Sequence, residues 1–259
     1  MTGLLTLLYG IVAYAIGLGS IVYAVGFTAN LVVPKSIDIG GVALPWQEAL
    51  LIDLVLLTVF ALQHSVMARR GFKRWWTRVI PEPIERSTFV LAAGLVLIAL
   101  FWFWAPIPTL VWSVDAPAAR AAIMAVYFAG WGVLVLSTFL INHFNLFGLS
   151  QVFAAWRGRT AVDPSFRTPF LYKVVRHPIY LGLLMAFWAA PDMTVGHLVF
   201  SIATTGYILI GIALEERDLI AIHGDLYRSY RHRVRMLLPL PMGQGRSPLP
   251  STSSKPLGH

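Results

Sequence analysis

The sequence contains no cysteine, and this absence excludes several kinds of chemistry. Disulfide bonds, thiolate metal sites and cysteine nucleophiles all require the missing side chain. The other potential metal ligands show no His-Glu-x-x-His motif or comparable spacing. We therefore expect neither a metal centre nor a redox-active thiol in this protein.

Charged residues are also scarce, at 12% of the chain, whereas an average soluble domain carries about 25%. Hydrophobic residues make up 57% of the 259 residues. The apolar runs are too long and too numerous to be the buried helices of a soluble protein. The composition therefore predicts an integral membrane protein that lies in a lipid bilayer.

The first apolar run has no basic segment before it and no small-residue cleavage site after it. We therefore expect it to be retained as a membrane helix rather than removed as a signal peptide. The following runs also have the length that a membrane-spanning helix needs. The predicted spans cover about residues 4–33, 48–68, 87–104 and 118–141.

The last apolar stretch, residues 179–214, is interrupted by Pro191 and Asp192. A single kinked helix of this length would measure roughly 54 Å, whereas the hydrocarbon core of a bilayer is about 30 Å thick. The alternative is a hairpin of a short helix at about 179–190 and a longer helix at about 195–218. The hairpin places all but two of the 20 Lys and Arg residues on one side of the membrane. The positive-inside rule therefore favours the hairpin.

The predicted fold is an all-α, polytopic bundle with four spans and a C-terminal helical hairpin, and both termini are predicted to be cytoplasmic. Residues 1–240 are expected to form a single domain, and residues 241–259, which are rich in Pro, Gly and Ser, are expected to form a disordered tail. The net charge of +8 does not predict nucleic-acid binding, because the basic residues lie in loops along one face of the membrane. We expect Trp46, Trp102, Trp104 and Trp112 at the outer interface. The oligomeric state stays open.

Polar residues from separate segments are expected at the cytoplasmic membrane face. They are His64 from the second span, Asn142 and His143 after the fourth, Arg176 and His177 before the hairpin, and Glu215 and Glu216 after it. Polar groups at this depth are costly and often functional. Each residue alone is more simply explained as a capping or interfacial residue, but the set predicts a site.

Four further positions have specific structural interpretations. Pro178 suits the first turn of a helix, and Gly182 allows a second backbone or a ligand to approach closely. Asp192 follows Pro191 at the hairpin turn, where it either caps the next helix or reaches a substrate. Asp53 in the second span is expected to snorkel or to pair with Lys35.

One combination of motifs resembles a known superfamily. It consists of Arg176-His-Pro-Ile-Tyr-Leu-Gly182, Glu215-Glu216-x-x-Leu219 and Tyr227-x-x-Tyr230-x-x-x-Val234. This combination resembles the isoprenylcysteine carboxyl methyltransferase superfamily of membrane proteins, which includes phospholipid methyltransferases and NnrU-like proteins. Arg235 departs from the pattern, because many relatives have proline there.

Within the superfamily, residues of about 60–240 are most similar to the bacterial methanethiol S-methyltransferases. The matching segments are Gln63-His-Ser-Val-Met-Ala-Arg-Arg70, Pro83-Ile-Glu-Arg-Ser87, Asn142-His-Phe-Asn-Leu-Phe-Gly148, Phe166-Arg-Thr-Pro169 and Phe187-Trp-Ala-Ala-Pro-Asp-Met-Thr194. The resemblance implies a location in the bacterial inner membrane, with the active site facing the cytoplasm.

The resemblance also implies S-adenosyl-L-methionine as the methyl donor, bound by the final hairpin and the C-terminal segment. The guanidinium of Arg176 is expected to form two parallel hydrogen bonds to the donor's carboxylate. Glu215 or Glu216 is expected to accept hydrogen bonds from the donor's amino or ribose groups. Tyr180 is expected to pack on its adenine. The full set of expected cofactor-binding residues is Tyr172, Arg176, His177, Pro178, Tyr180, Leu181, Gly182, Glu215 and Glu216.

The implied reaction is in-line methyl transfer to methanethiol or another small thiol, which would give dimethyl sulfide from methanethiol. The thiolate is the reactive nucleophile, so His64 or His143 is expected to act as a base or as a thiolate stabiliser. Asp192 is the next catalytic candidate. The substrate pocket is expected to be lined by Asn142, Phe187 and Trp188. The alternatives are a methyltransferase that acts on a lipid amine or a prenylcysteine carboxylate, and a non-enzymatic NnrU-like membrane protein.

Overall fold

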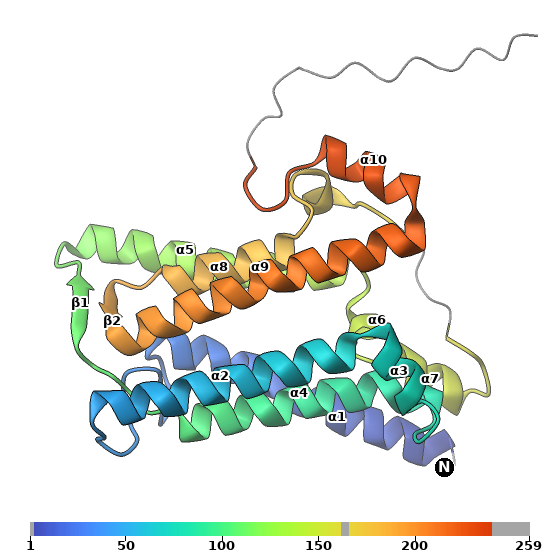
Figure 1. The fold of residues 1–259 in the computed structure, drawn as a ribbon, viewed down its shortest axis with the longest axis horizontal. Coiled ribbons are helices and arrows are strands. Elements are labelled where there is room, and N and C mark those ends of the chain that lie inside the picture. Colours follow the sequence, from blue (N-terminus) through green and yellow to red (C-terminus); the bar gives the residue numbers. More distant parts are fainter. Residues whose placement is uncertain (1–2, 162–165, 240–259) are drawn as a thin grey trace, which may run out of the picture.

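The computed structural model describes residues 3–161 and 166–239 (Figure 1). The predicted disordered tail, residues 241–259, lies outside the described residues. Within the described residues, five helices are long and apolar enough to cross a membrane. They are α1 (Gly3–Ala29), α2 (Trp46–Ala68), α4 (Glu82–Phe103), α5 (Pro117–Leu140) and α9 (Val195–His223). The protein is therefore an all-α polytopic membrane protein, as predicted.

The final apolar stretch forms the predicted hairpin. The short helix α8 (Pro178–Trp188) and the long helix α9 lie side by side and run in opposite directions (Figure 1). Pro178 occupies the first turn of α8, as expected. Thr194 caps α9, because its side chain accepts the backbone N–H of His197 at 3.1 Å. The expected helix-capping role of Asp192 is therefore wrong.

A two-stranded antiparallel sheet, which the sequence did not predict, closes the end of the bundle at this turn. Strand β1 (Leu110–Ser113) pairs with strand β2 (Asp192–Thr194), and Ser113 lies opposite Asp192. The strands tie the connection between α4 and α5 to the hairpin turn (Figure 1). Strands of three and four residues are too short to show an alternating pattern.

Helices α5 and α8 approach each other through a pair of glycines. A Cβ atom on Gly182 would lie 2.5 Å from the carbonyl oxygen of Gly130, and one on Gly130 would lie 2.6 Å from the carbonyl oxygen of Gly182. Small residues let membrane helices come this close. The close approach expected at Gly182 is therefore made by the backbone of a neighbouring helix.

Two polar or amphipathic side chains expected near the membrane surface are buried instead. Trp104 is 1% exposed, and its indole N–H donates to the carbonyl of Ile37 at 3.0 Å. Asp53 is fully buried and accepts the backbone N–H of Ala105 at 2.8 Å. Trp104 therefore packs inside the protein at the end of α4 instead of facing lipid, and the expected snorkelling of Asp53 is wrong. Both residues are held by backbone groups that are distant in the sequence.

Two helices end at points that differ from the apolar pattern. Helix α1 ends at Ala29, although the apolar run continues to Val33, because Asn30 and Val32 adopt positive φ angles of 57° and 58°. Helix α9 continues past residue 218 to His223 and ends before Gly224, which has a φ angle of 55°.

The short helices gather at one end of the bundle, together with the N-terminal residue Gly3 (Figure 1). They are α3 (Arg70–Trp76), α6 (His143–Leu146), α7 (Leu149–Trp156), the 3-10 helix η1 (Phe170–Lys173) and α10 (Asp225–Arg233). Of the described Lys and Arg residues, all except Lys35 and Arg120 belong to segments at this end. We call it the basic end, and we call the end that carries the sheet the sheet end.

Candidate active site

The carboxylate of Glu216 is the centre of a charged cluster at the basic end. Its Oε1 atom lies 2.7 Å from Nε of Arg176 and 3.1 Å from Nε2 of His177. Its Oε2 atom lies 3.2 Å from Nε of Arg231. The side chains of Glu216 and Arg176 are only 9% and 10% exposed. The antiparallel hairpin brings Glu216 beside the start of α8, and α10 supplies the third partner.

The chain after α10 returns to the start of α8 and completes this cluster. The backbone N–H of Arg176 donates to the carbonyl of Arg235 at 2.8 Å, and that of His177 donates to the carbonyl of Met236 at 3.2 Å. A guanidinium N–H of Arg176 also donates to the carbonyl of Val234 at 2.5 Å. Position 235 contributes only its carbonyl to these bonds. The departure from proline at Arg235 therefore leaves this contact intact.

Three tyrosines surround the charged cluster: Tyr227 and Tyr230 are buried, and Tyr172 is half-buried. The hydroxyl of Tyr230 donates to the carbonyl of Tyr172 at 2.6 Å, and Tyr227 and Tyr230 both pack against Phe166. Burial raises the pKa of Tyr230 to about 12, and it also raises the pKa of Tyr172 and of Tyr227. All three phenols are therefore protonated at physiological pH, and those of Tyr172 and Tyr230 donate to backbone carbonyls.

Glu215 and Tyr180 form the accessible side of the cluster. The Glu215 side chain is 43% exposed, and its Oε2 atom lies 3.8 Å from Nδ1 of His177. The ring centroid of Tyr180 lies 5.7 Å from that of His177. Gly211 leaves space beside Tyr180, because a Cβ atom there would lie 3.9 Å from the Tyr180 hydroxyl. Unlike Glu216, Glu215 therefore retains an accessible carboxylate.

His64 reaches this region from α2 through Tyr207 of α9. The Tyr207 hydroxyl lies 2.8 Å from Nδ1 of His64, and the Ser65 hydroxyl donates to it at 3.5 Å. Tyr207, Gly211 and Glu215 are spaced by four residues, so they lie along one face of α9. This face connects His64 to Tyr180 and Glu215. Tyr207 and Gly211 were not predicted as site residues: their four-residue spacing from Glu215 shows that they share its face of α9, but nothing in the sequence shows that this face meets His64.

A salt bridge further joins α2 to the same part of α9. NH1 of Arg69 lies 3.0 Å from Oδ2 of Asp218. The side chains are 35% and 40% exposed, so the bridge positions the helices more than it stabilises them. Arg69 and Arg231 were not predicted as site residues.

His143 and Asn142 are held elsewhere at the basic end. Nε2 of His143 lies 2.9 Å from the Tyr14 hydroxyl, and Nδ1 lies 2.9 Å from the Thr138 hydroxyl. Burial lowers the pKa of His143. Asn142 is exposed and caps α6 by accepting the backbone N–H of Asn145 at 3.2 Å. The described contacts of these residues join α1, α5 and α6, and they do not include the Glu216 cluster.

Phe187, Trp188 and Asp192 lie at the sheet end. Helix α8 separates them from His177 by about 15 Å. Phe187 is buried against Phe200 with ring centroids 4.9 Å apart, and the Trp188 indole donates to Thr205 at 2.9 Å. The predicted substrate pocket required these residues to lie beside His64, but among the described residues none of the three makes a hydrogen bond or a ring contact with it.

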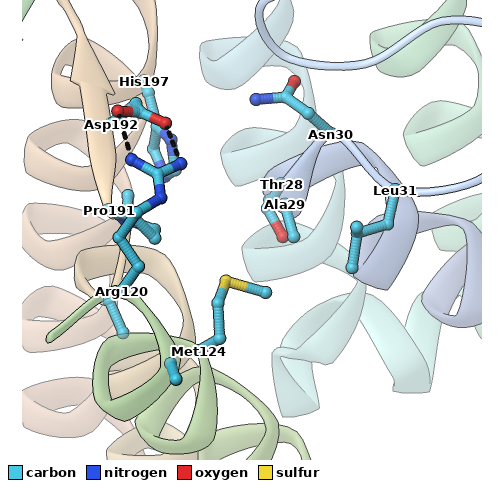
Figure 2. A pocket seen from close by; sticks show the side chains of 12 residues that line it. Thr28, Ala29, Asn30, Leu31, Arg120, Met124, Pro191, Asp192 and His197 are labelled. Carbon is cyan, nitrogen blue, oxygen red and sulfur yellow. Dashed lines mark hydrogen bonds and ion pairs between the residues drawn. The ribbon is translucent and has the colours of Figure 1, made fainter. Parts of the chain in front are cut away.

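Asp192 forms a double ion pair with Arg120, as Figure 2 shows. Its Oδ1 and Oδ2 atoms lie 2.9 Å and 2.6 Å from the two terminal nitrogens of Arg120, and the Ser113 hydroxyl donates to Oδ1 at 2.6 Å. The bonds from Arg120 and Ser113 lower the pKa of Asp192 to about 2. Asp192 is therefore an ionised carboxylate that joins β2 to α5 and β1.

The remaining predicted cofactor-binding residues lie on α8, so the position of this helix determines where they are. Pro178 and Leu181 belong to its first turn, directly after His177, and Gly182 faces α5 through Gly130. The site thus combines the start of α8, the end of α9, α10 and the end of α2. The fold and this site define a polytopic membrane protein with a charged and aromatic cluster at its basic end.

Comparison with known proteins identifies its relatives. The chain is 52% identical over 237 residues to methanethiol S-methyltransferase from Mycobacterium tuberculosis, covering 92% of this chain and 97% of that protein. It is 56% identical over 232 residues to methanethiol S-methyltransferase 1 from Bradyrhizobium diazoefficiens, covering 90% of this chain and 81% of that protein. It is also 31% identical over 209 residues to Nurim from Xenopus laevis, covering 74% and 73%.

The chain matches no family model and no solved structure. Its sequence identity to the methanethiol S-methyltransferases is nevertheless high enough, over enough of the chain, to assign its family. The chain belongs to the methanethiol S-methyltransferase family, and it is an enzyme of the methyltransferase class. The resemblance stated from the sequence motifs is therefore confirmed.

Proposed function

We propose that the protein transfers the methyl group of S-adenosyl-L-methionine to methanethiol or another small thiol, which gives dimethyl sulfide from methanethiol. The observation that carries this proposal is the position of His64, which Tyr207 links to the face of α9 that carries Glu215. His64, whose imidazole can stabilise a thiolate, is thus linked to the helix that carries the Glu215-Glu216 motif of the resemblance. We take methanethiol as the methyl acceptor because the relatives are named methanethiol S-methyltransferases.

The residues of the cluster fit a donor that carries both an ammonium and a carboxylate group. Glu215 offers an accessible carboxylate for the ammonium group. Arg231 is 44% exposed at its side chain and has N–H groups beyond the one facing Glu216, so it suits the carboxylate. Arg176 is already engaged by Glu216 and by backbone carbonyls, which makes it a positioning residue for this site.

When bound, the donor supplies a methyl group on a sulfonium, and the reaction is an in-line displacement by sulfur. Such a reaction depends mainly on positioning and electrostatics. Gly211 leaves room beside Tyr180, where an adenine ring can pack on the phenol. Tyr180 and the missing side chain at Gly211 are therefore proposed to shape the adenine site.

The bond to Tyr207 favours one role for His64. The Ser65 hydroxyl donates to Tyr207, so the Tyr207 proton is available for Nδ1 of His64. In a neutral ring that accepts at Nδ1, the other nitrogen carries the proton. We therefore propose that Nε2–H of His64 donates a hydrogen bond to the substrate thiolate. In this role His64 stabilises the thiolate, and the thiol proton passes to water.

We further propose that the enzyme lies in the bacterial inner membrane with its basic end in the cytoplasm. The concentration of Lys and Arg at this end supports the orientation. Because the chain lacks cysteine, single cysteines report it without background. Ala116→Cys at the sheet end should react with an impermeant reagent in intact cells, and Ser229→Cys should react only after lysis. The reverse pattern would invert the orientation.

The reaction is tested with purified protein, methyl-labelled S-adenosyl-L-methionine and a panel of acceptors. The panel contains methanethiol, longer alkanethiols, a primary lipid amine and a prenylcysteine. We expect label to appear in dimethyl sulfide and to decline as the thiol becomes larger. Transfer to the lipid amine or to the prenylcysteine, with none to methanethiol, would replace the proposed acceptor and retain the methyltransferase class.

A further inference from the structure

A pocket lies at the sheet end of the bundle, away from the Glu216 cluster (Figure 2). It has a volume of about 370 Å³. The last turn of α1, the first turn of α5 and the turn between α8 and α9 line it. Contacts of Phe187 with Trp131 and Phe200 fill the bundle beneath the turn, so this pocket is separate from the proposed active site.

His197 contributes a buried hydrogen-bond acceptor to the wall of this pocket. The residue is 2% exposed, and its Nε2 atom lies 3.0 Å from the carbonyl oxygen of Phe187. A carbonyl can only accept, so Nε2 carries the ring proton and Nδ1 of the neutral ring carries a lone pair. Among the described residues, Nδ1 has no hydrogen-bond partner. A buried acceptor without a donor is costly, so a ligand that donates a hydrogen bond is favoured here.

The other polar groups of the pocket favour a cationic donor. Asp192 contributes a carboxylate that is 43% exposed despite its ion pair. The C-terminal end of α1 contributes the negative end of a helix dipole. Arg120 is the one cation among the described lining residues, and Asp192 already neutralises it. The ion pair leaves no net charge, so the unpartnered Nδ1 of His197 and the negative end of α1 determine that a positively charged donor is favoured.

We propose that this pocket binds a primary ammonium group. The ammonium N–H groups donate to Nδ1 of His197 and to the carboxylate of Asp192, while the ligand's apolar part contacts Leu31 and Met124. Such a group occurs in the ethanolamine headgroup of phospholipids, which lies at the level of a helix end in a bilayer, and in free small amines. Both sources share the chemistry that the pocket recognises.

Two phospholipids with identical acyl chains test the proposal. Phosphatidylethanolamine carries a primary ammonium, whereas phosphatidylcholine carries the same charge without an N–H group. The purified protein is supplied with each lipid in detergent, and retained lipid is measured by native mass spectrometry. One charge-assisted hydrogen bond corresponds to about a tenfold difference, so we expect at least that preference for phosphatidylethanolamine. If both lipids are retained, and to the same extent, the proposal is overturned.

A matched pair of variants locates the site. Ala121 and Ala122 are both exposed on α5, but only Ala121 lines the pocket. Ala121→Leu should fill the pocket and abolish the preference, and Ala122→Leu should retain it. Methyl transfer should be unchanged in both, because the active site is at the other end. A preference that survives Ala121→Leu would mean that the ligand binds elsewhere.

Free ethanolamine distinguishes the two sources. If it displaces phosphatidylethanolamine only at high concentration, the natural ligand is the lipid headgroup. If it raises the melting temperature of the wild type but not of Ala121→Leu while neither lipid is retained, the ligand is a soluble amine. Both results support an ammonium site. No binding of either lipid or of ethanolamine would contradict it.

Discussion

At the basic end, Glu216 binds Arg176, His177 and Arg231, whereas at the sheet end Asp192 binds Arg120. The first carboxylate is 9% exposed and gathers partners from several segments. The second is 43% exposed and joins one strand to one helix. Removing one member of a buried ion pair leaves an uncompensated charge, but an exposed pair contributes little. A carboxylate–guanidinium ion pair therefore organises the candidate active site at the basic end, whereas at the sheet end it holds the hairpin turn in place.

The largest effect is expected from Glu216→Gln, which removes the counter-charge of buried Arg176. Loss of one partner of a buried pair costs about 3–5 kcal/mol. We expect a lower melting temperature and weaker binding of S-adenosyl-L-methionine, measured by thermal unfolding and calorimetric titration in detergent. Asp225→Asn is the control, because its pair with Arg228 is exposed. If both variants match the wild type, Glu216 does not organise the site.

The next effect concerns the proposed catalytic residue. His64→Ala removes the proposed hydrogen-bond donor to the substrate thiolate, and loss of one such donor typically lowers turnover about 10²-fold to 10³-fold. His64→Gln retains an N–H group but cannot accept a proton, so it should restore part of the activity. The readout is kcat for methanethiol together with donor affinity, which should be unchanged. Equal loss of activity in both variants would mean that His64 is a base.

A smaller effect is expected where α5 and α8 meet. Gly130→Ala forces a Cβ atom against the backbone of α8, and overpacking of this kind costs about 1–3 kcal/mol. Gly132→Ala is the matched control, because no atom lies within 4 Å of the added Cβ. Thermal unfolding should therefore separate two substitutions that lie two residues apart on one helix. Equal melting temperatures of the two variants would show that α5 and α8 can move apart at no cost in stability.

The smallest effect is expected from Asp192 as the pH falls. Its pKa is lowered to about 2 in the folded protein, against about 3.9 in an unfolded chain. The unfolded state then binds more protons, so the ion pair stabilises the fold above about pH 4 and loses this contribution as the pH falls towards 2. Asp192→Asn should remove this dependence, as measured by melting temperature against pH. Identical profiles of melting temperature against pH in the wild type and Asp192→Asn would contradict a lowered pKa at Asp192.

The sequence predicted the parts of this fold that hydropathy and charge determine. The spans and the hairpin follow from apolar length and from the placement of Lys and Arg, and the structure has both. Arg176, His177 and Glu216 were also predicted as site residues, and the structure brings them together.

The sequence did not predict contacts that depend on how distant helices align. Tyr207 meets His64 across 143 residues, and no local pattern marks such a pair. Phe187 was predicted to line the substrate pocket and Asp192 to be a catalytic candidate, because the segment that contains them is one of those that carry the resemblance. The length of α8 instead carries them to the sheet end, and only the structure shows this distance.

The central claim is that methyl transfer takes place at the basic end and not at the sheet end. The most direct measurement compares labelled dimethyl sulfide in the headspace above the wild type, His64→Ala and Asp192→Asn, each supplied with labelled S-adenosyl-L-methionine and methanethiol. We predict full activity for the wild type, activity within about twofold of it for Asp192→Asn, and a loss of about 10²-fold for His64→Ala. A loss in Asp192→Asn as large as in His64→Ala would contradict this account.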